Sequence, residues 1–172
     1  MTRRKVSGFL LILPILVFCG SISDADEDWV IREDGVGQLA IGMTLSQVNK
    51  TLREKFTLPA DKDNQPCFYV KTKRHQHIAF MIEDGRLTRM DVDAPGIFTV
   101  KHIQVGDSEA RAMRAYGQKL KVEPQHFIDG GHYLTIRSSN GRFGVRFETE
   151  KGKITNYYAG EFTSVQYEEG CQ

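Results

Sequence analysis

The sequence predicts an α+β fold in which two tandem strand-helix-three-strand repeats form an antiparallel sheet with helices packed on one face. Two pairs of similar segments carry this prediction. Leu39–Val48 (LAIGMTLSQV) matches Ile103–Ala112 (IQVGDSEARA), because in both an apolar strand end precedes a Gly, a hydroxyl residue and a helical pattern. Phe80–Thr88 (FMIEDGRLT) matches Phe147–Thr155 (FETEKGKIT) in its Phe, Glu, Gly, basic, aliphatic and Thr positions. The same order of both pairs indicates one unit of about 65 residues that is present twice.

The boundaries of the two units follow from this repetition. We expect residues 1–25 to be a signal peptide, residues 26–95 to form the first α/β repeat and residues 96–172 to form the second. A Pro-Gly linker at about Asp93–Gly96 (DAPG) joins the repeats, and together they make one compact domain.

Each unit contains a helix that has recognisable end signals. Thr44 is an N-cap residue with Gln47 three positions later, the pattern of a capping box. In the second unit, Asp107 or Ser108 caps a helix that Gly117 stops. The apolar residues at helical spacing in the first helix are Leu45, Val48 and Leu52.

Three strands are expected after each helix. The Asn140–Gly141 pair predicts a two-residue type I′ turn, which places Leu134 opposite Phe147 and Ile136 opposite Val145. The predicted strands are 67–73, 77–83 and 86–92 in the first unit, and 132–139, 142–149 and 154–162 in the second.

The remaining hairpin turns are predicted to have three residues, with Gly85 or Gly152 in the left-handed conformation. This loop length sets which side chains point to the core. The predicted inward residues are Thr88, Met90, Val92, Thr155, Tyr157 and Ala159, and the predicted outward residues are Ile154, Tyr158 and Phe162.

The N-terminal residues have the layout of a secretory signal peptide. A basic segment at 2–5 precedes the apolar run Phe9–Phe18, and we expect cleavage after Ala25. The run is about half of the 20 apolar residues that a membrane-spanning helix needs. Cys19 raises the alternative of a bacterial lipoprotein, but Phe18 stands where that processing needs a small residue, so plain secretion to the periplasm or the exterior is preferred.

Composition argues against a nucleic-acid partner. The chain has 172 residues, 40% hydrophobic and 26% charged, with a formal net charge of +1. Residues 1–25 hold three basic residues and one acidic residue, so the mature protein is slightly negative. A slightly negative protein does not attract a polyanion electrostatically, so we expect no nucleic-acid binding. We also expect no membrane span.

Export to an oxidising compartment makes the remaining cysteines informative. Cys67 and Cys171 are the only cysteines beyond the predicted signal peptide, and we expect them to form a disulfide. Two cysteines this far apart, without His or Cys at ligand spacing, do not predict a zinc site.

Gly42-Met43-Thr44, with Val48 and Leu52, resembles the opening motif of the periplasmic modules of the SmpA/OmlA outer-membrane assembly lipoproteins. Tandem copies of such a module resemble β-lactamase inhibitory proteins, in which two α/β repeats make a curved sheet that grips an enzyme. The ending Tyr167–Cys171 (YEEGC) also looks like that of exported bacterial proteins. The resemblance implies a binding module.

Acidic pairs are the main catalytic possibility. Asp91-x-Asp93 and Glu148-x-Glu150 each place two carboxylates on one side of a strand, as an envelope hydrolase could use. Nothing in the sequence predicts the burial that would raise one pKa, so solvated faces are the preferred interpretation.

Histidines offer two weaker possibilities. His75-x-His77 places two imidazoles on one side of a strand but lies in a basic turn without a third ligand, so a solvated basic edge is preferred over a metal site. His126 and His132, with Asp129, could form a base and its orienting group, but no nucleophile accompanies them. We therefore expect no metal and no cofactor.

The outward face of the second unit is the candidate binding surface, because Tyr and Arg are enriched at binding hot spots. We expect a non-enzymatic exported protein that holds a protein or cell-envelope partner through this face. An inhibitor or immunity protein against a secreted or periplasmic enzyme, and the envelope hydrolase, are the alternatives. The candidate residues are Tyr133, Arg137, Arg142, Arg146, Tyr158 and Phe162.

Overall fold

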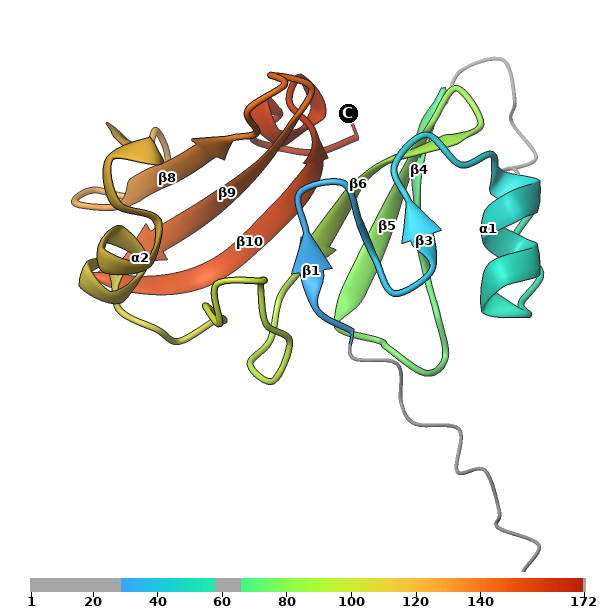
Figure 1. The fold of residues 1–172 in the computed structure, drawn as a ribbon, viewed down its shortest axis with the longest axis horizontal. Helices are drawn as coiled ribbons and strands as arrows, with labels where there is room; N and C mark the ends of the chain where they lie inside the picture. Colours follow the sequence, from blue (N-terminus) through green and yellow to red (C-terminus); the bar gives the residue numbers. More distant parts are fainter. Residues whose placement is uncertain (1–28, 58–65, 172) are drawn as a thin grey trace, which may run out of the picture.

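The computed structural model describes residues 29–57 and 66–171, which form a seven-stranded and a three-stranded antiparallel sheet with two short α-helices (Figure 1). The large sheet contains β4 (Cys67–Lys71), β5 (Ile78–Glu83), β6 (Arg86–Val92), β7 (Leu120–Pro124), β8 (His132–Arg137), β9 (Phe143–Glu150) and β10 (Lys153–Glu161). The small sheet contains β1 (Ile31–Arg32), β2 (Gly35–Val36) and β3 (Leu39–Ala40). The helices are α1 (Leu45–Leu52), α2 (Glu109–Tyr116) and the 3-10 turns η1 (Gly117–Lys119) and η2 (Ser164–Gln166).

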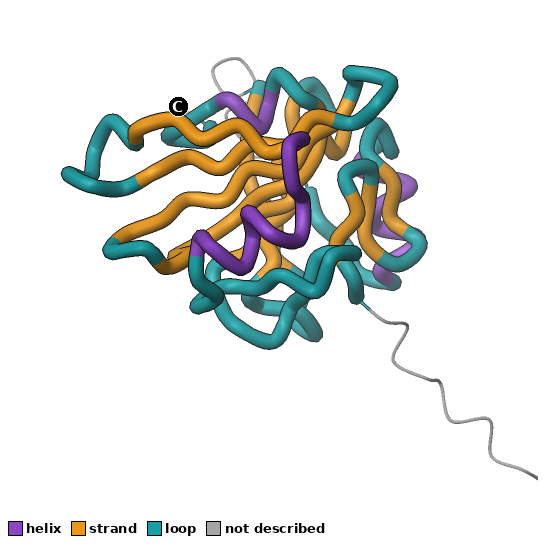
Figure 2. Tube along the Cα trace, turned by 60° about the vertical axis from the view of Figure 1, so that its left-hand side comes forward, coloured by secondary structure: helices purple, strands orange, loops and turns teal. Residues whose placement is uncertain are grey.

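The strand order of the large sheet is β4-β5-β6-β10-β9-β8-β7. The predicted combination of helices with antiparallel strands is confirmed, and loops and turns lie at the strand ends (Figure 2). The strands β1, β2 and β7 were not expected. β1 and β2 have two residues each, too few to show alternation, while β7 contains two charged residues and Pro124, which an edge strand tolerates.

Both helices begin where their capping residues predict. The Thr44 backbone N–H donates to Gln47 Oε1 at 2.8 Å, and the Gln47 N–H donates to Thr44 Oγ1 at 3.3 Å, so the capping box is confirmed. Ser108 is the N-cap of α2, accepting from the Arg111 N–H, and α2 ends at Gly117 with φ 59°. This decides between the two predicted capping residues.

The Asp84–Gly85 turn differs from the predicted three-residue loop. Both residues have positive φ, 49° and 75°, as a two-residue type I′ turn requires. Thr88 is then the extra residue of a β-bulge, which restores the inward orientation of Met90 and Val92. The paired residues are Glu83–Arg86, Ile82–Leu87 and Met81–Arg89.

The Lys151–Gly152 turn repeats this geometry, with φ values of 50° and 74° and a bulge that follows Ile154. The bulge reverses one prediction, because Ile154 is buried in the core and Thr155 is exposed. Tyr157 and Ala159 point to the core as predicted.

The hairpin at Asn140–Gly141 has the predicted register but another turn type. Leu134 pairs with Phe147 and Ile136 with Val145. Only Gly141 has positive φ, whereas a type I′ turn needs it at both residues. Asn140 instead uses its Oδ1 to accept the Arg142 backbone N–H at 3.0 Å.

One face of the large sheet contacts the main core. Its largest fully buried side chains are Tyr157, Phe80 and Phe147. The Tyr157 hydroxyl donates to the Ile97 carbonyl at 3.0 Å, so the loop after β6 is tied to this layer. The Tyr116 ring of α2 lies 5.7 Å from the Phe147 ring between centroids.

The predicted signal peptide, its cleavage site and Cys19 lie outside the described residues. Among the residues described, no helix is long and apolar enough to cross a membrane.

Candidate functional site

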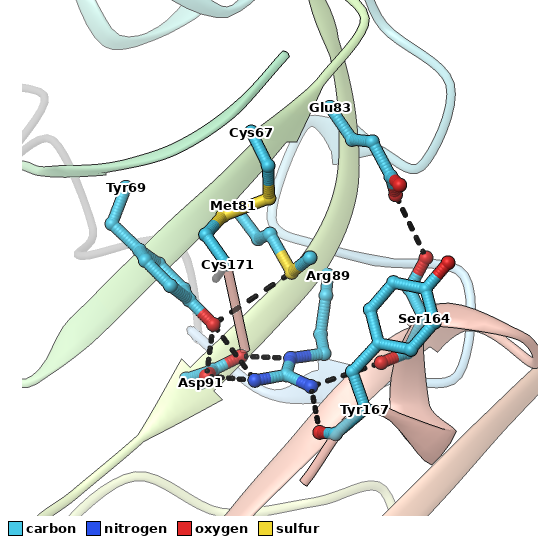
Figure 3. The surroundings of a disulfide bond; sticks show 9 residues. All are labelled: Cys67, Tyr69, Met81, Glu83, Arg89, Asp91, Ser164, Tyr167 and Cys171. Carbon is cyan, nitrogen blue, oxygen red and sulfur yellow. Dashed lines mark hydrogen bonds and ion pairs between the residues drawn. A yellow bond between two sulfur atoms is a disulfide. The ribbon is translucent and has the colours of Figure 1, made fainter. Parts of the chain in front are cut away.

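The C-terminal segment 162–171 lies over the second face of the large sheet and is tied to the edge strand β4 by the predicted disulfide. Cys67 and Cys171 are bonded, with a Cα–Cα distance of 5.3 Å. Figure 3 shows this bridge beside the side chains that hold the segment. The disulfide prediction is therefore confirmed.

Arg89 on β6 is the centre of these contacts, and its side chain is only 3% exposed. Its guanidinium donates two 2.7 Å hydrogen bonds to Asp91 and one 2.7 Å bond to the Tyr69 hydroxyl (Figure 3). It also donates to the carbonyls of Ser164 (2.9 Å) and Tyr167 (2.7 Å). Burial, followed by the charge of Asp91, raises the pKa of the Tyr69 phenol well above its ordinary value.

Arg146 on β9 makes a second anchor for the same segment. It donates to Thr135 Oγ1 at 3.0 Å and to the Gln166 side-chain oxygen, and its guanidinium lies 4.8 Å from the Tyr133 ring centroid. The Tyr158 hydroxyl donates to Glu148 at 2.9 Å. The Arg146 guanidinium and the Tyr158 hydroxyl therefore have their partners within the chain.

The predicted binding face is therefore covered where it was expected to be open. Tyr133, Arg146 and Tyr158 are 3%, 5% and 2% exposed, so the expectation of an exposed sheet face is wrong for these three residues. The reason is that the chain after β10 folds back over the sheet. Arg137 and Arg142 remain exposed at the β8–β9 hairpin, where Arg137 stacks over the Phe162 ring at 4.1 Å.

The acidic pairs are engaged separately. Asp91 is bound by Arg89, whereas Asp93 accepts from Lys71 at 3.4 Å and lies 3.0 Å from His77 Nδ1. Glu148 and Glu150 are likewise engaged, the latter by Lys151 at 2.8 Å. Neither pair lines the groove beside α1 that is described below.

The histidines also have partners other than those expected. His132 Nδ1 lies 3.0 Å from Glu109 Oε1, not beside Asp129, and the same carboxylate accepts from the Thr149 hydroxyl. His126 Nδ1 lies 2.8 Å from Glu168 of the C-terminal segment. Within 29–57 and 66–171, no group of three His, Cys, Asp or Glu side chains could hold a metal ion.

The surroundings of Glu109 lower the pKa of its carboxyl group. Burial raises its pKa, but the hydrogen bonds from Thr149 and His132, together with the His132 charge, outweigh burial and bring the pKa below its ordinary value. The contacts of Glu109 with His132 and Thr149 link α2 to β8 and β9.

A groove of about 1600 Å³ lies beside α1 and was not predicted. One wall is α1 with the residues that follow it, and the other is the end of β4 with the turn after it. Its apolar side chains are Trp29, Val36, Leu39, Met43, Leu52 and Phe56. Its cationic side chains are Lys50, Arg53, Lys55, Lys71, Lys73 and Arg74.

Three contacts hold the walls of the groove. Glu54 accepts from the Lys73 backbone N–H at 3.2 Å and so joins the walls. Asn49 makes two 2.9 Å hydrogen bonds with the Phe56 backbone, which fix the chain after the helix. The Trp29 ring stacks on the His75 ring with centroids 3.6 Å apart.

The charge of the groove is strongly one-sided. All six cationic side chains are exposed, and Glu54 is the only acidic side chain among the described residues that line the groove. Of the six, only Lys71 has an ion-pair partner in the described part of the chain. The available sequence signal was two short basic segments, 50–55 and 71–75, of which the second had been interpreted as a solvated edge. Only the fold brings them together.

Comparison with known proteins finds no family model, no curated protein and no solved structure that matches this chain.

Proposed function

We propose that the chain consists of two tandem α/β units, in each of which a helix precedes antiparallel strands, with the helices packed on one face of the sheet. Three strands follow α1, as expected, whereas four follow α2, because β7 is added, and no strand lies between β6 and α2. Support for the repeat comes from equivalent backbone hydrogen bonds between the start of each helix and the last hairpin of its unit. Val48 of α1 and Ala112 of α2 occupy equivalent positions, and both are fully buried in the core cluster. The equivalent bonds are Gly42 N to Leu87 O (2.7 Å) and Gly106 N to Ile154 O (2.8 Å), then Leu45 N to Gly85 O (2.9 Å) and Glu109 N to Gly152 O (3.0 Å).

The proposed function is that of a non-enzymatic exported binding protein of the bacterial periplasm, envelope or exterior. The observation that carries it is the groove beside α1, which is lined by half-buried apolar side chains and by six exposed cations, five of which have no ion pair with another described residue. A surface of this kind gains from a partner, since the partner removes apolar area from water and supplies the missing opposite charge. The Cys67–Cys171 disulfide supports export, because disulfides persist in oxidising compartments.

The proposed binding surface is therefore the groove and not the sheet face that the sequence predicted. The sheet face is occupied by residues 162–171, whereas the groove has no described segment of the chain across it. The exposed pair Arg137 and Arg142 forms a separate small surface at the β8–β9 hairpin.

Site-specific photocrosslinking tests the binding function. A benzoylphenylalanine in place of Thr51, which lines the groove, should capture a discrete partner from an envelope extract of the producing organism. The control position is Ser139, which is exposed on the β8–β9 hairpin. Equal capture from both positions would reject the groove, and no capture from either would reject the binding function. If the captured protein is an enzyme, its activity with and without this protein shows whether the role is inhibition.

A further inference from the structure

We propose that the partner seated in the groove beside α1 is an acidic polypeptide segment that also carries apolar side chains. This inference rests on the proposed binding function and adds the chemical class of the partner. It follows from the charge, depth and size of the groove.

The charge of the rim selects an acidic partner. Lys50, Arg53 and Lys55 lie on the α1 side, and Lys73 and Arg74 face them from the β4 side. The described lining residues include one carboxylate, Glu54, against six Lys and Arg side chains, so the lining keeps a net positive charge. Like charges held in one concave surface repel each other and attract carboxylates, and this attraction speeds encounter with an acidic partner.

The floor requires apolar groups as well. Trp29, Met43 and Phe56 line the groove and are half-buried, whereas its cationic side chains are exposed, so we treat the apolar side chains as its floor. A flat anionic surface, such as a bilayer of acidic lipids, would meet the exposed cations and leave the floor uncovered. A polypeptide segment with alternating acidic and apolar side chains reaches both levels, as in other groove-binding peptides.

The size of the groove favours a chain segment over a simple anion. Its volume of about 1600 Å³ exceeds the roughly 300–1000 Å³ of ordinary small-molecule pockets. The cations lie on two walls, so one phosphate or carboxylate would engage only a few of them. A chain segment that runs between the walls engages both sides.

Trp29 provides a direct readout, because it is the only tryptophan of the protein and lines the groove. The probe is a synthetic peptide of alternating Glu and Leu, titrated into the full mature protein at low salt while Trp29 fluorescence is followed. We expect saturable binding that changes the Trp29 emission and weakens with added salt. A matched peptide with Gln in place of Glu should bind about tenfold more weakly or worse.

A matched pair of charge-reversal variants locates the site. Lys73→Glu/Arg74→Glu should weaken binding of the Glu/Leu peptide by about tenfold or more, while Arg114→Glu/Lys119→Glu should change it by less than about twofold. Arg114 and Lys119 are exposed cations on α2 and η1, outside the groove, and have no ion pair with another described residue. Thermal unfolding of each variant verifies that both are folded.

Several outcomes would overturn the inference. Equal loss in both double variants would mean that net charge, not the groove, attracts the peptide. If the Trp29 titration shows tighter binding of phosphatidylglycerol vesicles than of the peptide, the groove is assigned to a lipid surface. If it shows tighter binding of inorganic phosphate, the groove is assigned to a free anion. The Thr51 photocrosslinking can be repeated with an excess of the Glu/Leu peptide added before irradiation. If a partner is captured and the peptide does not reduce its capture, the binding function stands and the acidic-segment inference fails.

Discussion

Glu109 and His132 form a contact between the start of α2 and β8. The Glu109 carboxylate accepts from the Thr149 hydroxyl and lies 3.0 Å from His132 Nδ1, while its side chain is 14% exposed. These hydrogen bonds favour the charged form of Glu109, so its pKa falls below the ordinary value although burial acts in the opposite direction. Its position in the first turn of α2 also favours a negative charge through the helix dipole.

Glu109→Gln should therefore flatten the acid side of the stability profile. Folded Glu109 binds protons more weakly than unfolded Glu109, so its contribution is complete above the unfolded pKa of about 4.5 and is lost as the pH falls through the lower folded value. Urea unfolding of wild type and variant from about pH 7 to pH 3 measures this difference. The control is Glu161→Gln, because Glu161 has no side-chain hydrogen bond or ion pair with another described residue. A constant wild-type-to-variant difference across this range would contradict the prediction.

The C-terminal segment is the element that decides which face of the sheet is free. Arg89 and Arg146 bind its carbonyls, and each is a nearly buried charge that needs those acceptors. The disulfide joins residues with a sequence separation of 104. This cross-link lowers the conformational entropy of the unfolded chain and thereby stabilises the folded state. Segment and sheet face therefore stabilise each other.

Cys67→Ser/Cys171→Ser should lower the free energy of unfolding by about 2–4 kcal/mol. Amide hydrogen exchange should also rise in residues 162–171, since the segment then keeps only its hydrogen bonds and its contacts with the sheet. Chemical denaturation and hydrogen exchange measure the two effects, and reduction of the wild-type disulfide should reproduce both. Unchanged protection of 162–171 would show that Arg89 and Arg146 hold the segment without the bridge.

At the scale of the whole molecule, β6 and β10 join the two halves of the large sheet. Gly160 pairs with Arg89 at this junction, and a Cβ on Gly160 would lie 2.1 Å from the Thr88 carbonyl oxygen and 2.7 Å from the Arg89 Cα. Both contacts are with backbone, which cannot turn away as a side chain can. The close approach of the two halves thus depends on a residue without a side chain.

Gly160→Ala should destabilise the protein by about 1–3 kcal/mol, because the strands must separate to admit the methyl group. Trp29 fluorescence reports the first half, and far-UV circular dichroism reports the whole sheet. We expect the two unfolding transitions to coincide in wild type and to shift together in the variant, since both halves share one sheet. A variant in which the dichroism transition moves while the Trp29 transition stays would contradict one cooperative sheet.

The positions of six strands of the large sheet, the N-caps of the helices and the hairpin register could be predicted, because they depend on residues close together in sequence. Thr44 with Gln47 and Leu134 opposite Phe147 are such cases. The lengths of the hairpin loops could not be predicted from the alternation of inward and outward side chains alone. The extra residue Thr155 of the β-bulge shifts this alternation by one position after the turn, as a longer loop would. A bulge and a longer loop place most inward residues alike, and only the burial of Ile154 distinguishes them.

The sequence by itself determined six of the seven strands of the large sheet, the starts of both helices and the pairing of Cys67 with Cys171. Tertiary structure alone decided that Tyr133, Arg146 and Tyr158 are covered, and that segments 50–55 and 71–75 form one groove. The physical reason is range. Hydrogen bonding and side-chain alternation act between near neighbours, whereas the freedom of a surface depends on where distant segments come to rest after the whole chain has buried its apolar side chains.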